Sequence, residues 1–206
     1  MFKGAYGRFA IKFDTFMIHI ADKSHINYNM ECQKEYFIFC LAGFLFTCVV
    51  GTFSHFFYQW AGSSSWAALL FPVNESTWEH LKLVFFSVFL YFTVGFFFMK
   101  DASNYLAAAF LCMLTAVVLI PAIFYSYTAI TGKSILAVDI LTFFVAVLAG
   151  FVVAYFVLNA SPKTALNVLS AAGLTVFLML YLTLTFYPPQ CFLFKDPVSG
   201  GYGIIR

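Results

Sequence analysis

Charged side chains are scarce in this chain, and almost half of them lie near its start. Of the 206 residues only 20 are Asp, Glu, Lys or Arg, and nine of these fall in the first 35 positions. The other 171 residues therefore carry 11 charges, whereas a soluble domain carries roughly a quarter charged residues. So few charges cannot cover a water-facing surface, and lipid must solvate most of it. A soluble enzyme, a DNA-binding module and a disordered chain are excluded, and the net charge of +2 gives no reason to expect a nucleic-acid partner.

Five apolar stretches are long enough to cross a bilayer as helices, since a crossing needs about 20 residues. They cover residues 36–60, 81–99, 105–130, 135–158 and 165–187. The polar turns between the last four are short, so consecutive helices are expected to be antiparallel neighbours. No ten-residue alternating pattern typical of a β-barrel is present. The sequence predicts an all-α, polytopic membrane bundle of about five helices within residues 36–187.

Three stretches are neither spans nor short turns. Residues 1–35 combine apolar residues at helical spacing with basic ones, which is typical of an amphipathic helix on a membrane surface; an extension before a start at Met30 is the open alternative. Residues 61–80 predict a short interfacial or re-entrant helix that stops near Pro72. The tail, 188–206, contains many turn formers and several aromatic residues, so we expect it to pack back onto the bundle.

Because the helices alternate in direction, polar side chains distant in sequence are predicted to meet at one end of the bundle. His55 lies near the end of the first span, and a polar cluster opens the second. The third span ends in two tyrosines, and a carboxylate lies about one turn into the fourth. The candidate binding residues at this end are Glu75, Glu79, His80, Lys82, Asp139, Tyr125 and Tyr127.

The segment before the second span has the pattern of a helix start. Ser76 and Glu79 have the spacing of a capping box, in which each side chain satisfies a free backbone N–H at the start of the helix. Glu75 precedes Glu79 by four residues, which would place both carboxylates on one helical face. Like charges at that spacing repel unless a cation or a proton lies between them.

Three interpretations of this segment remain open. In the first, the two carboxylates and His55 or His80 bind a divalent metal ion, because such ligands can converge from facing helices. In the second, the same groups and Asp139 form a path for protons or cations. In the third, Lys82 and Glu79 form a structural ion pair. The metal ligands that the first interpretation predicts are His55, Glu75 and Glu79.

The leading functional hypothesis is a membrane protein that binds or conducts a cation or a small polar solute. One alternative is a membrane-embedded, metal-dependent enzyme for an apolar or lipid substrate, with a glutamate as general base beside a metal-bound water. Another is a structural subunit of a membrane complex, and a homo-oligomer also stays open. Seven Lys and Arg residues fall on the N-terminal side of the predicted topology and four on the other, which favours a cytoplasmic N-terminus.

Two motifs carry a resemblance to a known family. Residues 72–83 read PVNESTWEHLKL, and residues 194–204 read FKDPVSGGYGI. From about Met30 onward, with these motifs written PVNExxWEHLKL and FKDPxxGxYGI, the chain resembles an uncharacterised family of small bacterial multi-pass membrane proteins. The resemblance implies a multi-pass fold and a bacterial plasma membrane, and it implies no activity.

Overall fold

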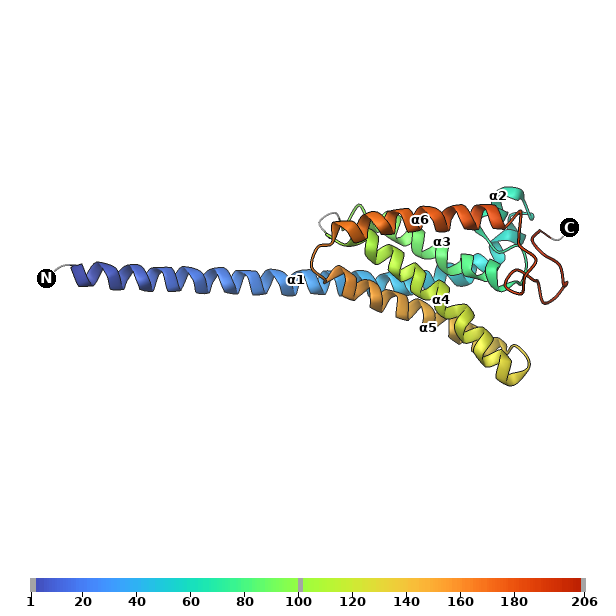
Figure 1. Cartoon of the computed structure of the whole chain (residues 1–206), viewed down its shortest axis with the longest axis horizontal. Helices are drawn as coiled ribbons and strands as arrows, with labels where there is room; N and C mark the ends of the chain where they lie inside the picture. The colour runs from blue at the N-terminus through green and yellow to red at the C-terminus, as the bar shows by residue number, and fades with distance from the viewer. Residues whose placement is uncertain (1–2, 100–101, 205–206) are drawn as a thin grey trace. The chain divides into compact units, whose positions relative to one another are not determined.

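The computed structural model describes the backbone of residues 3–99 and 102–204, and the side chains of residues 30–99 and 102–204. The regular elements in these ranges are all helices, six in number, which confirms the all-α prediction (Figure 1). They are α1 (Lys3–Trp60), α2 (Ser65–Leu70), α3 (Thr77–Gly95), α4 (Tyr105–Thr131), α5 (Leu136–Leu158) and α6 (Thr164–Leu184). The chain divides into two compact units, Met1–Phe39 and Cys40–Arg206, and the second unit contains the helix bundle.

In the described part of the chain, four helices are long and apolar enough to cross a membrane. Their bounds are Met30–Trp60, Tyr105–Thr131, Leu136–Leu158 and Thr164–Leu184. These four match the first, third, fourth and fifth predicted spans. The fold is therefore a helical membrane bundle.

The second predicted span, 81–99, differs from the structure in both position and character. Its helix, α3, runs from Thr77 to Gly95, because the Ser76 side chain caps it by accepting a hydrogen bond from the Glu79 N–H. Ten of its 19 residues are buried, among them Glu79 and Lys82. These buried polar residues in its first turns leave α3 outside the set of four apolar helices. The expected five apolar spans therefore become four, with α3 as a half-buried fifth helix.

Close packing in the bundle depends on a glycine in α1. A Cβ added at Gly51 would lie 2.6 Å from Cζ of Phe143 in α5 and 3.1 Å from the carbonyl oxygen of Leu83 in α3. Even an alanine here would require the Phe143 ring to move and the Leu83 backbone to give by a few tenths of an ångström. Gly51 therefore lets α1 approach α3 and α5 one turn before His55.

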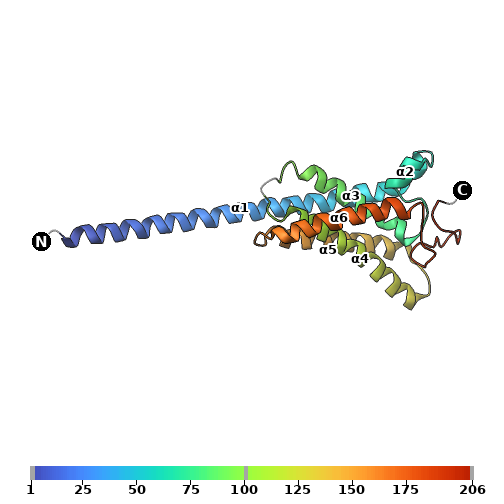
Figure 2. The ribbon, with the colours of Figure 1, turned by 45° about the horizontal axis from the view of Figure 1, so that its top comes forward.

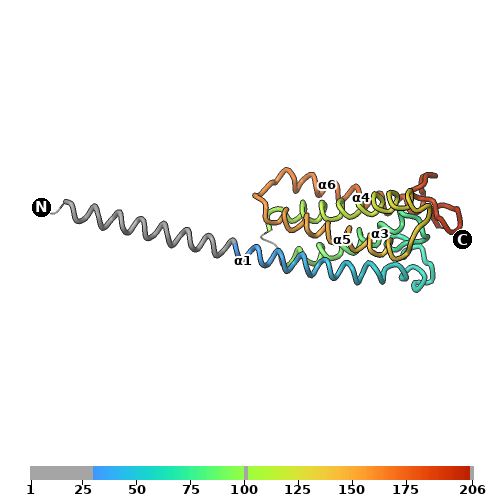
Figure 3. Tube along the Cα trace, turned by 90° about the horizontal axis from the view of Figure 1, so that it is seen from below, coloured from blue at the N-terminus to red at the C-terminus, as the bar shows by residue number. Residues whose placement is uncertain are grey.

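The C-terminal tail contacts the start of α3. The backbone N–H of Trp78 donates to the carbonyl of Leu193 at 2.9 Å, and the Trp78 ring stacks between Tyr181 and Phe194. In three views the tail lies at the same end of the bundle as α2 and the start of α3 (Figures 1, 2 and 3).

The N-terminal prediction concerns residues 1–35. The backbone from Lys3 onward is helical as part of α1. The side chains of residues 1–29, on which the amphipathic pattern depends, lie outside the described side chains, so an interfacial role stays a prediction. The short helix α2 lies within the loop 61–80, and its Trp66 side chain is 61% exposed.

Candidate functional site

Two histidines and one glutamate meet at the end of the bundle that carries α2 and the tail. One ligand atom each from His55, Glu75 and His80 can be chosen so that all three lie within 4.8 Å of one another. Nε2 of His80 lies 3.4 Å from Oε2 of Glu75, and Nε2 of His55 lies 3.9 Å from Oε1. The two imidazole rings lie side by side, with centroids 5.2 Å apart. We call these three residues the His–Glu–His cluster.

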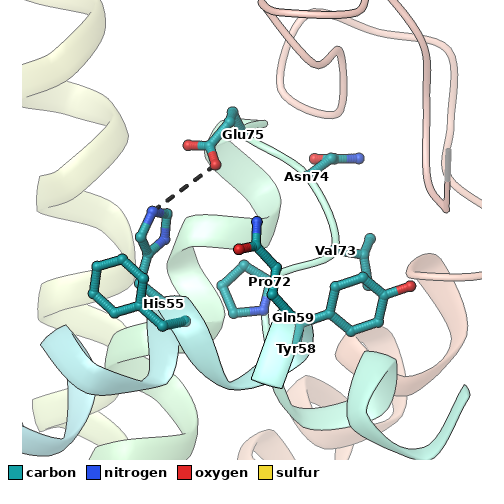
Figure 4. A pocket seen from close by; sticks show the side chains of 8 residues that line it. His55, Tyr58, Gln59, Pro72, Val73, Asn74 and Glu75 are labelled. Atoms are coloured by element: carbon teal, nitrogen blue, oxygen red, sulfur yellow. Dashed lines mark ion pairs between the residues drawn. The ribbon is translucent and has the colours of Figure 1, made fainter. Parts of the chain in front are cut away.

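The cluster combines residues from three elements. His55 comes from the last turns of α1, Glu75 from the loop after α2, and His80 from the first turn of α3. Figure 4 shows the His55 ring pointing at the Glu75 carboxylate. Because Gly51 allows the close approach of α1 to α3, the two histidines can face one carboxylate from opposite elements.

The orientation of His80 is fixed by the helix start. Its Nδ1 lies 3.0 Å from the carbonyl oxygen of Ser76, the N-cap residue. A carbonyl oxygen only accepts hydrogen bonds, so Nδ1 carries a proton in either charge state of the ring. In the imidazolium form Nε2 carries a proton too and can donate to Glu75, whereas in the neutral form the lone pair of Nε2 is free to bind a cation. That nitrogen faces Glu75. In metal-binding histidines, the ring nitrogen that does not bind the metal commonly donates to a backbone carbonyl, and this hydrogen bond orients the ring.

The Glu75 carboxylate is half-exposed, with 49% of the side chain accessible. A hydrogen bond from His80 lowers the pKa of Glu75, and the positive charge that either histidine can carry acts in the same direction, against the opposing effect of burial. The ionised form is therefore favoured, and this is the form that binds cations.

A hollow of about 110 Å³ lies beside His55 and Glu75 (Figure 4). Its lining combines apolar residues with a tyrosine, a glutamine and an asparagine. The lining residues are His55, Phe56, Tyr58, Gln59, Pro72, Val73, Asn74 and Glu75.

Glu79 lies outside the cluster. Its Oε2 accepts from Nζ of Lys82 at 2.6 Å and from the backbone N–H of Val73 at 3.0 Å. Lys82 also donates to the carbonyl of Ala68 at the end of α2. Glu79 is 2% exposed and Lys82 0%, so the pair is enclosed by protein. The contacts are those of a structural ion pair that joins α2, its loop and α3.

The helix boundary also corrects the expected spacing of the two carboxylates. Glu75 precedes the N-cap residue Ser76, so it lies outside α3 and shares no helical face with Glu79. The predicted metal set of His55, Glu75 and Glu79 therefore has two members in the cluster, and His80 lies where Glu79 was expected.

The remaining candidate residues belong to other contacts. The hydroxyl of Tyr125 lies 3.0 Å from Oγ1 of Thr77 at the start of α3. The Tyr127 hydroxyl donates to the Asp139 carboxylate and accepts from the backbone N–H of Ile135, which joins the ends of α4 and α5. None of these three candidates is a member of the cluster.

Two residues that hold the loop of Glu75, Asn74 and Asp196, were not among the predicted site residues. The Asn74 side chain accepts from the Ser76 N–H at 2.9 Å and donates to the carbonyl of Gly203 at 2.8 Å. Gly203 has a φ of +67°, a left-handed conformation that favours glycine. The asparagine and the glycine therefore connect the loop of Glu75 to the tail.

Asp196 is the second of these residues. Its carboxylate accepts from the backbone N–H groups of Val198 and Ser199, both at 3.1 Å, and from the backbone of Glu75. Burial alone would raise the pKa of Asp196, but hydrogen bonds from Ser199, Val198 and Glu75 outweigh it and lower the pKa. The turn formers around Asp196 were a signal for a tight loop, but nothing in them indicated which segment the loop would hold.

Comparison with curated proteins and with solved structures finds no match. A family model described as a family of unknown function (DUF6512) matches residues 26–204, a range that contains both motifs and all the contacts between them. This confirms the resemblance to an uncharacterised family. The chain belongs to the DUF6512 family.

Proposed function

We propose that this membrane protein binds a divalent transition-metal ion at the His–Glu–His cluster. The observation that carries the proposal is the convergence of three ligand atoms, each from a different element, within 4.8 Å. The bundle lies in the bilayer, and the metal ion is the proposed ligand of the His–Glu–His cluster.

The spacing of the ligand atoms suits a small metal ion. Zinc lies about 2.0–2.1 Å from histidine nitrogen and carboxylate oxygen, so neighbouring ligands of a tetrahedral site lie about 3.3 Å apart. The distances of 3.4 and 3.9 Å from Glu75 oxygens to the two Nε2 atoms are close to this value. All three ligand atoms lie within 4.8 Å of one another, so the widest pair would have to approach by up to about 1.5 Å to complete a tetrahedral set.

The chemistry of the ligand set selects the class of ion. Imidazole nitrogen suits zinc and its transition-metal neighbours, whereas calcium and magnesium prefer oxygen ligands throughout. Two of the three donors here are imidazoles. A set of two histidines and one glutamate is also a known ligand set of catalytic zinc sites, which keep a further position open.

Binding is better supported than conduction. The sequence offered Glu75, Glu79 and Asp139 together as groups for a cation path, but Glu79 pairs with Lys82 and Asp139 pairs with Tyr127. The cluster itself lies at a helix end and in a loop. Conduction stays an independent hypothesis, to be tested by ion flux into liposomes.

Metal content tests the proposal. The full chain, purified in mild detergent, is loaded with Zn²⁺, freed of unbound metal and analysed by mass spectrometry. We expect about one zinc per chain in the wild type, because the cluster offers one set of ligands, and loss of that zinc in His55→Ala and Glu75→Gln. Asp139→Asn is the matched control, since it makes the same carboxylate-to-amide change at the same end of the bundle. A wild type without zinc, or zinc retained in both cluster variants, would overturn the proposal.

The predicted location, a bacterial plasma membrane with a cytoplasmic N-terminus, stays a proposal as well. On that orientation the end of α1 and the cluster face the outside of the cell. Cys191 lies in the tail at this end and is exposed. A membrane-impermeant thiol reagent should therefore label Cys191 on intact cells, whereas labelling only after lysis would reverse the orientation.

A further inference from the structure

The free coordination position of the proposed metal ion faces the hollow. Three protein ligands leave one of the four positions of a tetrahedral zinc ion open. His55 and Glu75 line the hollow, whereas His80 does not. An ion held among the three is therefore expected to have His80 on one side and, on the other, the hollow that His55 and Glu75 line.

The hollow has room and polarity for a small ligand. Its volume of about 110 Å³ is several times the roughly 10–15 Å³ that one water molecule requires. The residues that line it include Gln59 and Asn74, which carry polar carboxamide groups. Among the described side chains, His55 also has a buried Nδ1 without a hydrogen-bond partner, and such a group usually has a partner in water or in a ligand.

Charge favours an anion in this position. A divalent ion bound by one carboxylate and two neutral imidazoles leaves a local charge of +1. The nearby carboxylate of Asp196 is already satisfied by backbone N–H groups of the tail and of Glu75. A monoanion with an oxygen donor would neutralise the site and supply the fourth ligand.

The surroundings of the hollow are aromatic and exposed. Phe56 lines the hollow and stacks on Trp60, and Phe57 packs against the edge of the same indole. Trp60 is 65% exposed. Exposed aromatic residues at the end of a membrane-spanning helix are typical of headgroup depth, so an amphiphile in the membrane can present its polar head here.

We propose that the open position binds a carboxylate monoanion, either free in water or as the head of a membrane amphiphile. This inference rests on the proposed metal site. The carboxylate oxygen fills the fourth position of the ion, Gln59 donates to the other oxygen, and Trp60 contacts an apolar chain where one is present.

Cobalt spectroscopy separates this inference from the metal site itself. The full chain in detergent is loaded with Co²⁺, whose visible absorption reports its ligands, and is titrated with acetate and with decanoate. We expect both to change the spectrum, with decanoate binding about tenfold more tightly, which corresponds to about 1.4 kcal/mol of additional contact. Gln59→Leu should weaken both carboxylates several-fold and keep the cobalt content.

Two tryptophan variants identify the source of the carboxylate. Trp60→Ser should remove the preference for decanoate, whereas Trp66→Ser, on α2 and outside the lining of the hollow, should keep it. This result supports an amphiphile. Equal affinities for acetate and decanoate in the wild type support a carboxylate free in water. A preference for decanoate that persists in Trp60→Ser overturns the contact between Trp60 and the apolar chain.

Failure of the two proposals gives different results. Cobalt that binds but keeps an unchanged spectrum with both carboxylates overturns the inference and leaves the metal site intact. Absence of cobalt binding overturns the metal site before any carboxylate is added.

Discussion

Two glutamates four residues apart have opposite surroundings in this protein. Glu79 is 2% exposed, and its Oε2 lies 2.6 Å from the ammonium group of Lys82. Glu75 is 49% exposed and faces two imidazoles at 3.4 and 3.9 Å. One carboxylate has every partner it needs within the protein, and the other does not.

The difference begins with the helix boundary. Because Ser76 caps α3, Glu79 lies in the first turn and its side chain turns into the bundle. Glu75 lies before the cap, in a loop that the tail holds through Asn74 and Asp196. The same residue type thus becomes a structural group inside the helix and a ligand-like group outside it.

The comparison predicts that stability and ion binding are separable. A buried charge that loses its partner destabilises a fold strongly, whereas a half-exposed charge can be rehydrated. Substitutions in the buried pair should therefore act on folding, and substitutions in the His–Glu–His cluster on metal binding.

The largest expected effect is on the buried pair. Lys82→Met leaves the Glu79 carboxylate buried without a counter-charge, which should lower the free energy of unfolding by about 3–5 kcal/mol. Thermal unfolding in detergent measures the loss. The double variant with Glu79→Leu should regain much of it, because an apolar pair replaces an ionic one. A single variant that melts with the wild type would mean that water already reaches the pair.

The next largest effect is a loss of metal affinity with little change in the stability of the fold. Glu75→Gln should change the free energy of unfolding by less than about 1 kcal/mol, because the side chain is half-exposed. Loss of a residue that only hydrogen-bonds to a metal ligand typically weakens metal binding by about 10–100-fold. Glu75→Gln changes a proposed ligand itself, so it should weaken zinc binding by more than that. Unfolding and zinc titration on the same preparation test both statements. A variant that loses both properties together would contradict the separation.

A smaller effect is expected from the tail. Asp196→Asn removes a charged acceptor from the backbone of Glu75, so the loop is held less firmly. We expect zinc affinity to fall by about tenfold, the smaller end of the range for residues that support a metal ligand. The effect is small because Asp196 contacts the backbone of Glu75 rather than its carboxylate. The measurement is again a zinc titration, with Asp139→Asn as the control.

The same contact gives a pH dependence with a defined sign. The pKa of Asp196 is lowered in the folded chain, so its contribution to stability is present above the ordinary Asp range and is lost as pH falls through the folded value. Between about pH 7 and 5 the contact should hold. Resistance of the tail to proteolysis should therefore be constant over that interval and fall only in stronger acid, and a loss already at about pH 6 would contradict this.

Much of the fold could be predicted because its signals are local. Apolar length predicted the third, fourth and fifth spans to within three residues and the first to within six. The spacing of Ser76 and Glu79 indicated the cap of α3. The apolar span was predicted to begin at 81, four residues after the start of α3 at Thr77, because the first turns of α3 contain the charged residues Glu79 and Lys82. Their burial becomes visible only when the end of α2 supplies the Ala68 carbonyl to Lys82.

The site was predicted in part for a related reason. Antiparallel helices bring His55 and the start of α3 to one end, and this follows from the chain order alone. Which carboxylate would face the histidines depends on contacts between residues far apart in sequence, such as Asn74 with Gly203. No pattern within residues 72–83 contains that information.

The smallest expected effect is at Asp139, a carboxylate in a third environment. It accepts a hydrogen bond from Tyr127 between the ends of α4 and α5 and is partly exposed. An asparagine side chain at this position would still accept that bond, so Asp139→Asn should cost about 1 kcal/mol or less and leave zinc binding unchanged. Unfolding and zinc titration measure both. If zinc binding fell with this substitution as far as with Glu75→Gln, the metal site would extend to α5. Asp139 would then be a second ligand-binding carboxylate beside Glu75.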